Sequence, residues 1–192
     1  MPLSPAQFRA KGHGKTGPWV DLVNSEEWDT YGQRTEWLED ASWLSFFLEQ
    51  WRFPAAGRKS FPAEKFRTLR SALRIACEAI FTGRRIPPDA LDALNSALSL
   101  AGRHQLMERQ NGLQLEFVPS SKGWDWVLAQ TALSFASLLA GGEMSRVKIC
   151  SNQDCRWVFC DATKARSRRW CSDKVCGNRD RVRRARARMA GQ

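Results

Sequence analysis

The chain has 192 residues, of which 43% are hydrophobic and 26% are charged. This length suffices for one ordinary domain and a small appendage, and the composition is that of a globular protein. The first fifteen residues contain no apolar run, and no later segment has the uninterrupted apolar length of a membrane span. We therefore expect neither a secretory signal nor a membrane protein, and we expect a cytoplasmic chain whose thiols stay reduced.

The excess positive charge lies entirely in the last quarter of the chain. Residues 1–144 contain 16 Lys+Arg and 16 Asp+Glu, whereas residues 145–192 contain 14 Lys+Arg and 4 Asp+Glu. The last segment thus accounts for the whole net charge of +10. A neutral globular body joined to a basic segment indicates a polyanionic partner, and nucleic acid is the first choice.

The first part of the body combines a loose arm with short apolar segments. Residues 1–18 are rich in Pro, Gly and Lys, and we expect a flexible N-terminal arm there. The apolar segment 19–24 is expected to be a strand or a buried extended piece. Apolar residues then recur at helical spacing over about 36–51, with Thr35 as a cap, and predict a helix that leads into a loop over 54–62.

Two further helices follow that loop. A long apolar face predicts a helix over about 63–82, which Gly83 ends. Arginines occupy its opposite face, which we interpret as a solvated surface, and Cys77 lies on the apolar stripe and is expected in the core. A second helix begins at Pro87-Pro88-Asp89 and turns its leucines inward before Gly102. The arginines are Arg67, Arg70 and Arg74, and the leucines are Leu91, Leu94 and Leu98.

One stretch carries a clear β signal. Asn111-Gly112 favours a two-residue hairpin turn, because both residues tolerate positive φ. Apolar and polar residues alternate after it over 113–117, and the preceding strand is expected at about 104–109. We expect this hairpin to pack as a small sheet against the helices. A last body helix is predicted from Asp125, as its N-cap, to Gly141-Gly142, where the body joins the basic segment.

The body carries no familiar catalytic motif. Its sequence contains no Gly-rich phosphate loop, no GxSxG turn, no HExxH helix and no paired-carboxylate motif. We therefore expect a protein that is not an enzyme.

Four cysteines near the C-terminus form two pairs. Cys150 and Cys155 have four residues between them, and after fifteen further residues Cys171 and Cys176 repeat this spacing. Two cysteine pairs separated by a short loop are typical of a closed tetrahedral site, most often for zinc. Four thiolates leave no vacant position on the metal, which predicts a structural ion. The alternative of two disulfides is disfavoured in a reducing compartment.

A fifth cysteine complicates the ligand set. Cys160 also has four residues between it and Cys155, so spacing alone does not exclude it. We favour Cys150 as the ligand, because residues 147–149 are expected to form a strand that delivers it and residues 157–159 the returning strand.

The last segment predicts a basic helix with a narrow apolar stripe. At about 100° per residue, Val182, Ala185 and Met189 share one side, through which the helix can dock, and arginines flank both edges. Arg183 and Arg184 are expected to project most fully outward. Positive charge dominates here and in the loop between the cysteine pairs, which favours nucleic-acid binding over docking on an acidic protein or no specific role. The candidate contact residues are Lys164, Arg166, Arg168, Arg169, Arg179, Arg183, Arg184, Arg186 and Arg188.

These residues resemble a known family. Cys150 and Cys155, then Phe159-Cys-Asp161, Arg168-Arg-Trp-Cys171 and Cys176-Gly-Asn-Arg179, are similar to the CGNR zinc finger, a module typically found behind an ABATE domain in bacterial proteins. Asp21-Leu-Val-Asn24-Ser resembles the Leu-Asp-Phe-Val-Asn-Thr element of the ABATE domain. The resemblance implies zinc on Cys150, Cys155, Cys171 and Cys176, and it implies that Cys160 is not a ligand. The family is described as stress-related transcriptional regulators, with DNA binding inferred.

We therefore predict a mainly α fold with a small β-hairpin. A flexible arm over 1–18 precedes an ABATE-like helical body over 19–142 and a CGNR-like zinc finger with a basic helix over 146–190. The expected function is that of a bacterial transcription regulator that holds a structural Zn²⁺ and binds DNA in preference to RNA. We expect the body to act as a sensor, a homodimerisation unit or both. The alternatives are a protein-interaction module that docks on an acidic partner and non-specific binding of RNA or DNA.

Overall fold

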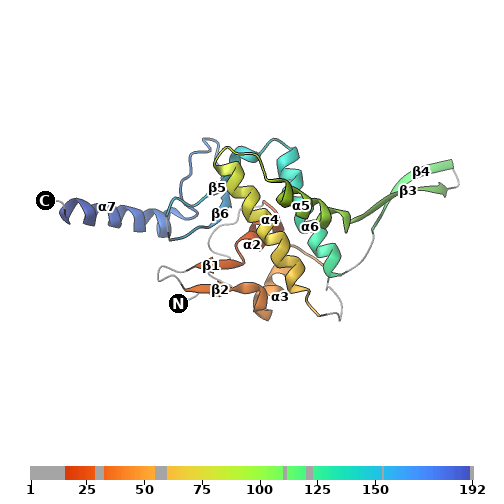
Figure 1. Cartoon of the computed structure of the whole chain (residues 1–192), viewed down its shortest axis with the longest axis horizontal. Helices are drawn as coiled ribbons and strands as arrows, with labels where there is room; N and C mark the ends of the chain where they lie inside the picture. Colours follow the sequence, from red (N-terminus) through yellow and green to blue (C-terminus); the bar gives the residue numbers. More distant parts are fainter. Residues whose placement is uncertain are drawn as a thin grey trace.

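The computed structural model describes residues 16–28, 33–54, 60–109, 112–119, 123–152 and 154–190. Most of the predicted N-terminal arm and Asn111 of the hairpin turn lie outside these residues. Helices dominate the described part, and the strands form three antiparallel pairs, which confirms the expected fold class (Figure 1). The α-helices are α2 (Pro18–Val23), α3 (Ala41–Gln50), α4 (Ala63–Phe81), α5 (Pro88–Ser99), α6 (Trp124–Ala140) and α7 (Asn178–Ala190). The strand pairs are β1 (Glu26–Trp28) with β2 (Arg34–Glu36), β3 (Gly102–Arg109) with β4 (Gly112–Pro119), and β5 (Val147–Ile149) with β6 (Val158–Cys160). Short helical turns complete the order: η1 (Trp37–Glu39), η2 (Met144–Arg146) and η3 (Asp173–Gly177).

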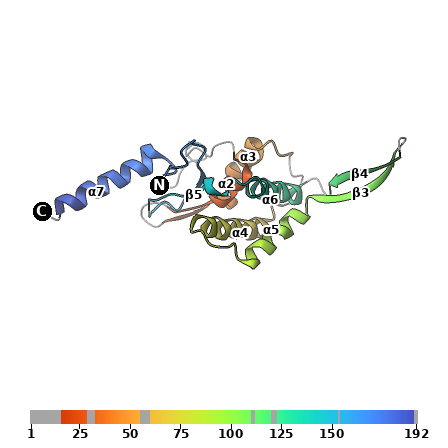
Figure 2. The ribbon, with the colours of Figure 1, turned by 90° about the horizontal axis from the view of Figure 1, so that it is seen from above.

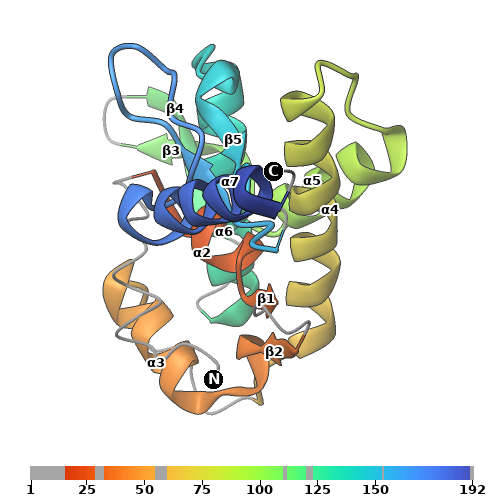
Figure 3. The ribbon, with the colours of Figure 1, turned by 90° about the vertical axis from the view of Figure 1, so that its left-hand side faces the viewer.

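Helix α2 is buried at the centre of the body, between α4 and α6 (Figure 3). The expectation of a strand or extended piece over 19–24 is therefore wrong. Pro18 stands in the first turn, where its missing N–H is not needed and its fixed φ suits a helix. The helix is one and a half turns long and buried on all sides, so its sequence has no polar face from which a helical period could be read.

Helix α3 begins later than expected. Thr35 lies in β2 rather than at a helix cap, and the turn η1 separates that strand from α3. Asp40 is the actual N-cap, because its Oδ1 accepts hydrogen bonds from the backbone N–H of Ser42 (2.7 Å) and Trp43 (3.1 Å). The sequence signal for this cap is Asp40 itself, which lies within the longer stretch of helical periodicity over 36–51 and therefore falls in the interior of the predicted helix.

Helix α4 follows its predicted limits and runs along one side of the body. It ends where Gly83 adopts a φ of 68°, a left-handed conformation that glycine takes without strain. The arginines opposite its apolar face do not form a solvated surface, which corrects that expectation. Arg70 is buried, and its two terminal nitrogens donate to the two carboxylate oxygens of Glu36 at 2.6 and 2.7 Å. Arg67 pairs with Glu39 at 2.6 Å, so this face joins α4 to the β2–η1 segment.

Two details of the next helices also differ from expectation. Leu91 on α5 is 41% exposed rather than inward, whereas Leu94 is buried. Helix α6 begins after Gly123, and Asp125 makes no cap; its carboxylate instead pairs with Lys65 at 2.8 Å.

The β3–β4 hairpin forms as predicted, but it does not pack on the helices. It projects from the body as a two-stranded ribbon, at the end opposite α7 (Figures 1 and 2). Leu106 and Leu113 are 64% and 71% exposed. The alternation that predicts the strands is thus correct, while the burial inferred from it is not.

One hydrophobic core runs through the body into the β5–β6 pair. Its centre contains the fully buried side chains of Trp19, Trp43 and Phe135. Val158 and Phe159 of β6 belong to the same cluster, as do three of the four paired cysteines. The segment that carries the cysteines is therefore seated on the body rather than attached by a free linker.

Candidate metal centre and basic surface

Four cysteine thiols converge beside the β5–β6 pair. Cys150 directly follows β5, and Cys155 lies in the turn that leads to β6. Cys171 lies two residues before η3, and Cys176 lies within η3. Their four sulfur atoms all lie within 4.8 Å of one another, and the Sγ of Cys171 is 3.6 Å from those of both Cys155 and Cys176. None of the four forms a disulfide. The structure thus brings together the four cysteines that the sequence pairs.

Backbone hydrogen bonds hold this cluster in place. The N–H of Cys150 donates to the carbonyl of Trp157 at 2.9 Å, across the β5–β6 turn. The neighbouring loop is tied down by the N–H of Ser151, which donates to the carbonyl of Arg169 at 2.8 Å. Ser172 caps η3, since its hydroxyl accepts from the N–H of Val175 at 3.3 Å.

The thiols of the cluster cannot all ionise without a cation. Hydrogen bonding from the Cys155 thiol lowers the pKa of Cys150, and the thiolate of Cys150 in turn raises the pKa values of Cys155 and Cys171. A divalent cation would balance the additional thiolate charge. Around such an ion, tetrahedral bonds of about 2.3 Å would separate the sulfurs by roughly 3.8 Å, close to the spacing found here. The donor set and its spacing are those of a closed metal site.

The two remaining cysteines lie outside this cluster. Cys160 is buried in β6, and burial raises the pKa of its thiol. Cys77 is buried on α4, where burial raises its pKa to about 12. Both thiols therefore stay protonated, as buried core cysteines do.

The loop between the cysteine pairs uses part of its positive charge internally. Arg168 is partly buried; its Nε donates to the carbonyl of Trp170 at 2.8 Å, its Nη2 donates to that of Cys171, and its guanidinium lies 4.8 Å from the centre of the Phe159 ring. Arg166 is engaged with Ser145 and Glu143 on the preceding segment. In contrast, Lys164 is exposed, and Arg169 is exposed with its guanidinium over the ring of Trp170.

Helix α7 carries its arginines in two different environments. Arg183 and Arg184, which the sequence places most outward, both pair with the buried carboxylate of Asp180, at 2.7 and 2.8 Å. Three further candidates are exposed, and none of them has an ion-pair partner among the described residues. They are Arg179, Arg186 and Arg188.

The apolar stripe of α7 does not dock on the body. Val182 is 42% exposed and Met189 is 78% exposed. Only the first part of the helix lies against η3, and the rest extends away from the molecule (Figure 2). The arginines on both edges of the stripe are consequently accessible to a partner.

Comparison with known families assigns both parts of the chain. Residues 17–142 match the family model of ABATE, described as "Putative stress-induced transcription regulator". The chain belongs to the ABATE family. Residues 146–189 match the CGNR zinc finger, in agreement with the cysteine cluster, and no curated protein matches the chain. Among the described residues of this ABATE protein, every helix is too short or too polar to cross a membrane.

The joint between the ABATE body and the CGNR finger contains residues that sequence reasoning missed. Asn24 is fully buried after α2, and its side chain pairs with the backbone of Val158 in β6: Nδ2 donates to the carbonyl at 2.8 Å, and Oδ1 accepts from the N–H at 2.9 Å. Nδ2 also donates to the carbonyl of Val20 at 2.8 Å. The side chain of Asn24 thereby makes the hydrogen bonds to β6 that a neighbouring strand would make. The sequence marks Asn24 only as part of the Asp21-Leu-Val-Asn24-Ser element that resembles the ABATE domain, and that resemblance gives no indication of its partner in β6.

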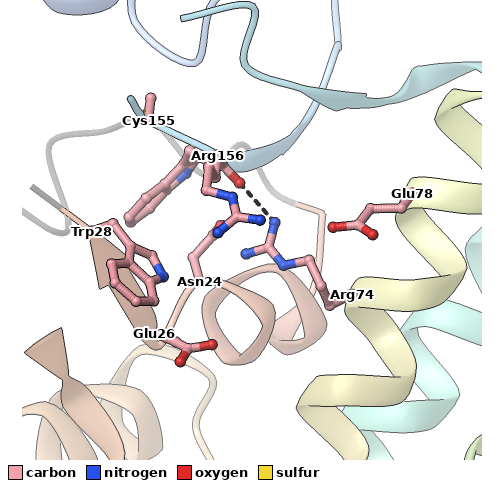
Figure 4. Close-up of a pocket in the computed structure, with 8 residues that line it drawn as sticks. Asn24, Glu26, Trp28, Arg74, Glu78, Cys155 and Arg156 are labelled. Atoms are coloured by element: carbon pink, nitrogen blue, oxygen red, sulfur yellow. Dashed lines mark hydrogen bonds between the residues drawn. The ribbon is translucent and has the colours of Figure 1, made fainter. Parts of the chain in front are cut away.

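A second contact closes the same joint. Arg74 on α4 donates from Nη1 to the carbonyl of Arg156 in the finger at 2.7 Å, and from Nη2 to the carbonyl of Val23 at 2.9 Å (Figure 4). Between these groups lies a small cavity of about 90 Å³. The ABATE body therefore reaches the finger through side chains from both α2 and α4.

Proposed function

We propose that this ABATE protein is a transcription regulator that binds DNA through its CGNR finger and helix α7. The observation that carries the proposal is the free-standing α7, whose Arg179, Arg186 and Arg188 are exposed and form no ion pair with a carboxylate in the part of the chain that the structure describes. A helix of this width fits the major groove of DNA, and arginines along it can contact phosphates and base edges. The family description supports a role in transcription.

We propose that the bound metal is zinc and that its role is structural. Cys150, Cys155, Cys171 and Cys176 would supply four soft thiolates in a tetrahedron, which suits Zn²⁺ and leaves no position for a substrate. The ion would neutralise the thiolates and join the β5–β6 turn to η3. Because α7 follows η3 directly, the direction in which α7 leaves the body depends on this site.

In this proposal the basic residues have distinct roles. Arg179, Arg186 and Arg188 contact the nucleic acid directly, together with Lys164 and Arg169 from the loop. Arg183 and Arg184 exchange their shared carboxylate on Asp180 for phosphate groups. Arg168 and Arg166 shape the loop, since their guanidinium groups already bond within the protein. The basic residues with these roles are Lys164, Arg166, Arg168, Arg169, Arg179, Arg183, Arg184, Arg186 and Arg188.

The body has a supporting role in this proposal. It acts in the cytoplasm as a sensor, a homodimerisation unit or both, and it carries no catalytic site. The absence of catalytic motifs in its sequence supports this assignment.

The test is selection of randomised duplex DNA by the zinc-loaded full-length protein at about 150 mM salt, with RNA as competitor. We expect a reproducible motif that RNA does not displace and that is lost with Cys171→Ser. The combined variant Arg186→Ala/Arg188→Ala should lower the slope of log affinity against log salt by up to about 1.8, since each lost phosphate contact removes about 0.9. Arg103→Ala, an exposed arginine on the distant ribbon, serves as the matched control.

A second candidate is a protein-interaction module that docks α7 on an acidic partner. The exposed stripe of Val182 and Met189 favours it, because such a partner could cover apolar surface. Failure to retain DNA at this salt concentration would overturn the DNA proposal in favour of this candidate. Binding without sequence enrichment would replace a specific regulator by a non-specific nucleic-acid binder.

A further inference from the structure

A groove of about 470 Å³ lies where the end of α4 meets η2 and β5 (Figure 1). One wall is the segment from the end of α4 towards the start of α5, and the other is η2 with the beginning of β5. The groove therefore lies between the ABATE body and the segment that enters the finger. Its volume is within the range of about 300–1,000 Å³ that is usual for small-molecule sites.

Apolar side chains from both walls line this groove and are open to solvent. Phe81 at the end of α4 and Met144 in η2 are each 47% exposed, and the half-buried Ile80 and Ile86 line the same groove. Large apolar side chains that gather in one concave surface mark a place where apolar surface of a partner can be buried. The groove thus suits a ligand with an apolar body.

The charged residues of the groove are all cations. Arg84, Arg85 and Lys148 line it, and none of its lining residues is an aspartate or a glutamate. Arg84 donates from Nε to the hydroxyl of Thr82 at 2.9 Å, which leaves its charge unpaired. Within the part of the chain that the structure describes, none of the three cations forms an ion pair. The groove therefore combines an apolar lining with positive charge from both walls.

The chain itself offers no occupant of the required charge. Glu143 lies next to the groove in sequence, but it is held by Arg146 and, at 3.6 Å, by Arg166. Residues 1–15 contain three Lys+Arg and no Asp or Glu, and α7 is strongly basic. These segments carry the wrong sign of charge for the groove, whether they belong to the same chain or to a second copy. Charge complementarity therefore favours an anion from outside the chain.

We propose that this groove binds a small organic acid with an apolar body. The carboxylate of the acid pairs with Arg85 and Lys148, which come from opposite walls, and its hydrocarbon part lies on Phe81 and Met144. Ion pairs of this kind form charge-assisted hydrogen bonds, and the apolar contacts select against small inorganic anions. The acid links the body to β5, the strand that Cys150 follows. This inference does not depend on whether α7 binds DNA.

The test titrates octanoate into the zinc-loaded full-length protein by isothermal titration calorimetry. We expect octanoate to bind at least about tenfold more tightly than acetate, because burial of about two additional methylene groups gives this difference. Octylammonium, which has the same chain and the opposite charge, should not bind. At about ten times its Kd, octanoate should raise the Tm by roughly 3–6 °C.

Three variants locate the site. Arg85→Gln/Lys148→Gln should lower the affinity for octanoate at least about tenfold and remove the rise in Tm, because the carboxylate loses both charged partners. Arg52→Gln/Arg103→Gln is the charge-matched control and should leave both unchanged, since these arginines are exposed and lie outside the groove. Phe81→Ser keeps the charges and should reduce the preference for octanoate over acetate.

Several outcomes would overturn the inference. Equal affinities of the groove variant and the control variant for octanoate would place binding elsewhere. Equal affinities of the wild type for octanoate and acetate would mean that the groove attracts only counter-ions. Absence of octanoate binding, together with weaker duplex DNA binding by Arg85→Gln/Lys148→Gln than by the control variant, would assign these cations to the nucleic-acid surface instead.

Discussion

At the scale of single residues, Asn24 at the end of α2 joins the body to the finger through its side chain. Its amide satisfies both the N–H and the carbonyl of Val158, a residue 134 positions away in the chain. Each backbone group left unsatisfied in a buried position costs about 1–3 kcal/mol. The side chain of Asn24 therefore supplies to Val158 the two hydrogen bonds that a neighbouring strand would otherwise supply.

We expect Asn24→Ala to lower the free energy of unfolding by about 3 kcal/mol, since it leaves two buried backbone groups without partners. This loss corresponds to a fall in Tm of roughly 6–12 °C for a chain of this size. Denaturant titration of the zinc-loaded protein provides the measurement. Asn95→Ala, which changes an exposed asparagine on α5, should alter stability by less than about 0.5 kcal/mol. Equal effects of the two substitutions would contradict the role given to Asn24.

The ion pair between Glu36 and Arg70 makes stability depend on pH. Burial acts to raise the pKa of Glu36, but the hydrogen bonds and charge of Arg70 outweigh it, and the pKa lies below its ordinary value of 4.5. A carboxyl with a lowered folded-state pKa stabilises the fold above the ordinary value, and this contribution is lost as the pH falls below it.

Glu36→Gln should therefore destabilise the protein by about 3 kcal/mol at pH 7, because it leaves the Arg70 charge buried and unpaired. Between pH 5 and pH 3 the loss of stability should be shallower in Glu36→Gln than in the wild type. Urea titrations at several pH values measure both effects, with the exposed Glu49→Gln as reference. Parallel pH curves for wild type and Glu36→Gln would rule out the linkage.

At the scale of elements, the β3–β4 ribbon contributes little burial. Because Leu106 and Leu113 are mostly exposed, Leu106→Thr/Leu113→Thr should change the free energy of unfolding by less than about 1 kcal/mol. Leu73→Ala, at a fully buried position of α4, should cost about 2–5 kcal/mol in the same denaturant titration. A loss of comparable size in the ribbon variant would show that the ribbon packs in solution.

The elements that could be predicted from sequence are those with a two-sided environment. Helix α4 has an apolar face and a polar face, so its period is visible over its whole length. Helix α2 is buried all round and has no such contrast. In the ribbon, Leu113 alternates with polar neighbours whether or not another element packs on the apolar face, so the alternation predicts a strand but not its burial. Arg70 was predicted to be exposed and is instead buried, because it pairs with the carboxylate of Glu36, which is distant in sequence.

The candidate site also contains parts that the sequence predicts and parts that it does not. The cysteine cluster could be predicted, because the spacing of the ligands within each pair is short and visible in the sequence. The contacts at the joint could not be predicted, because Asn24 and Arg74 are far from the finger in sequence and meet it only in the folded chain. The pairing of Arg183 and Arg184 with Asp180 is local, at three and four residues along α7, and such spacing allows ion pairs on a helix, although both arginines were expected to project outward.

At the scale of the whole molecule, the finger and the ABATE body share one hydrophobic core. We expect the zinc-loaded protein to unfold in a single thermal transition. Removal of the metal by a strong chelator should lower the Tm of the entire chain by at least about 10 °C, given apparent zinc-binding energies of about 10–16 kcal/mol in small fingers. Differential scanning calorimetry distinguishes the outcomes: a body transition that ignores the chelator would mean that the two parts are independent.

The isolation of α7 has a thermodynamic consequence for binding. An unsupported helix of 13 residues is marginal in water, and like charges spaced three or four residues apart weaken it further. When a polyanion neutralises the arginines, α7 becomes more ordered and loses conformational entropy. This loss of entropy reduces the favourable free energy of association. Amide hydrogen exchange along α7 should accordingly slow on addition of duplex DNA. Val182→Ala, which raises intrinsic helix propensity by about 0.5 kcal/mol, should tighten DNA binding by roughly twofold without adding a contact.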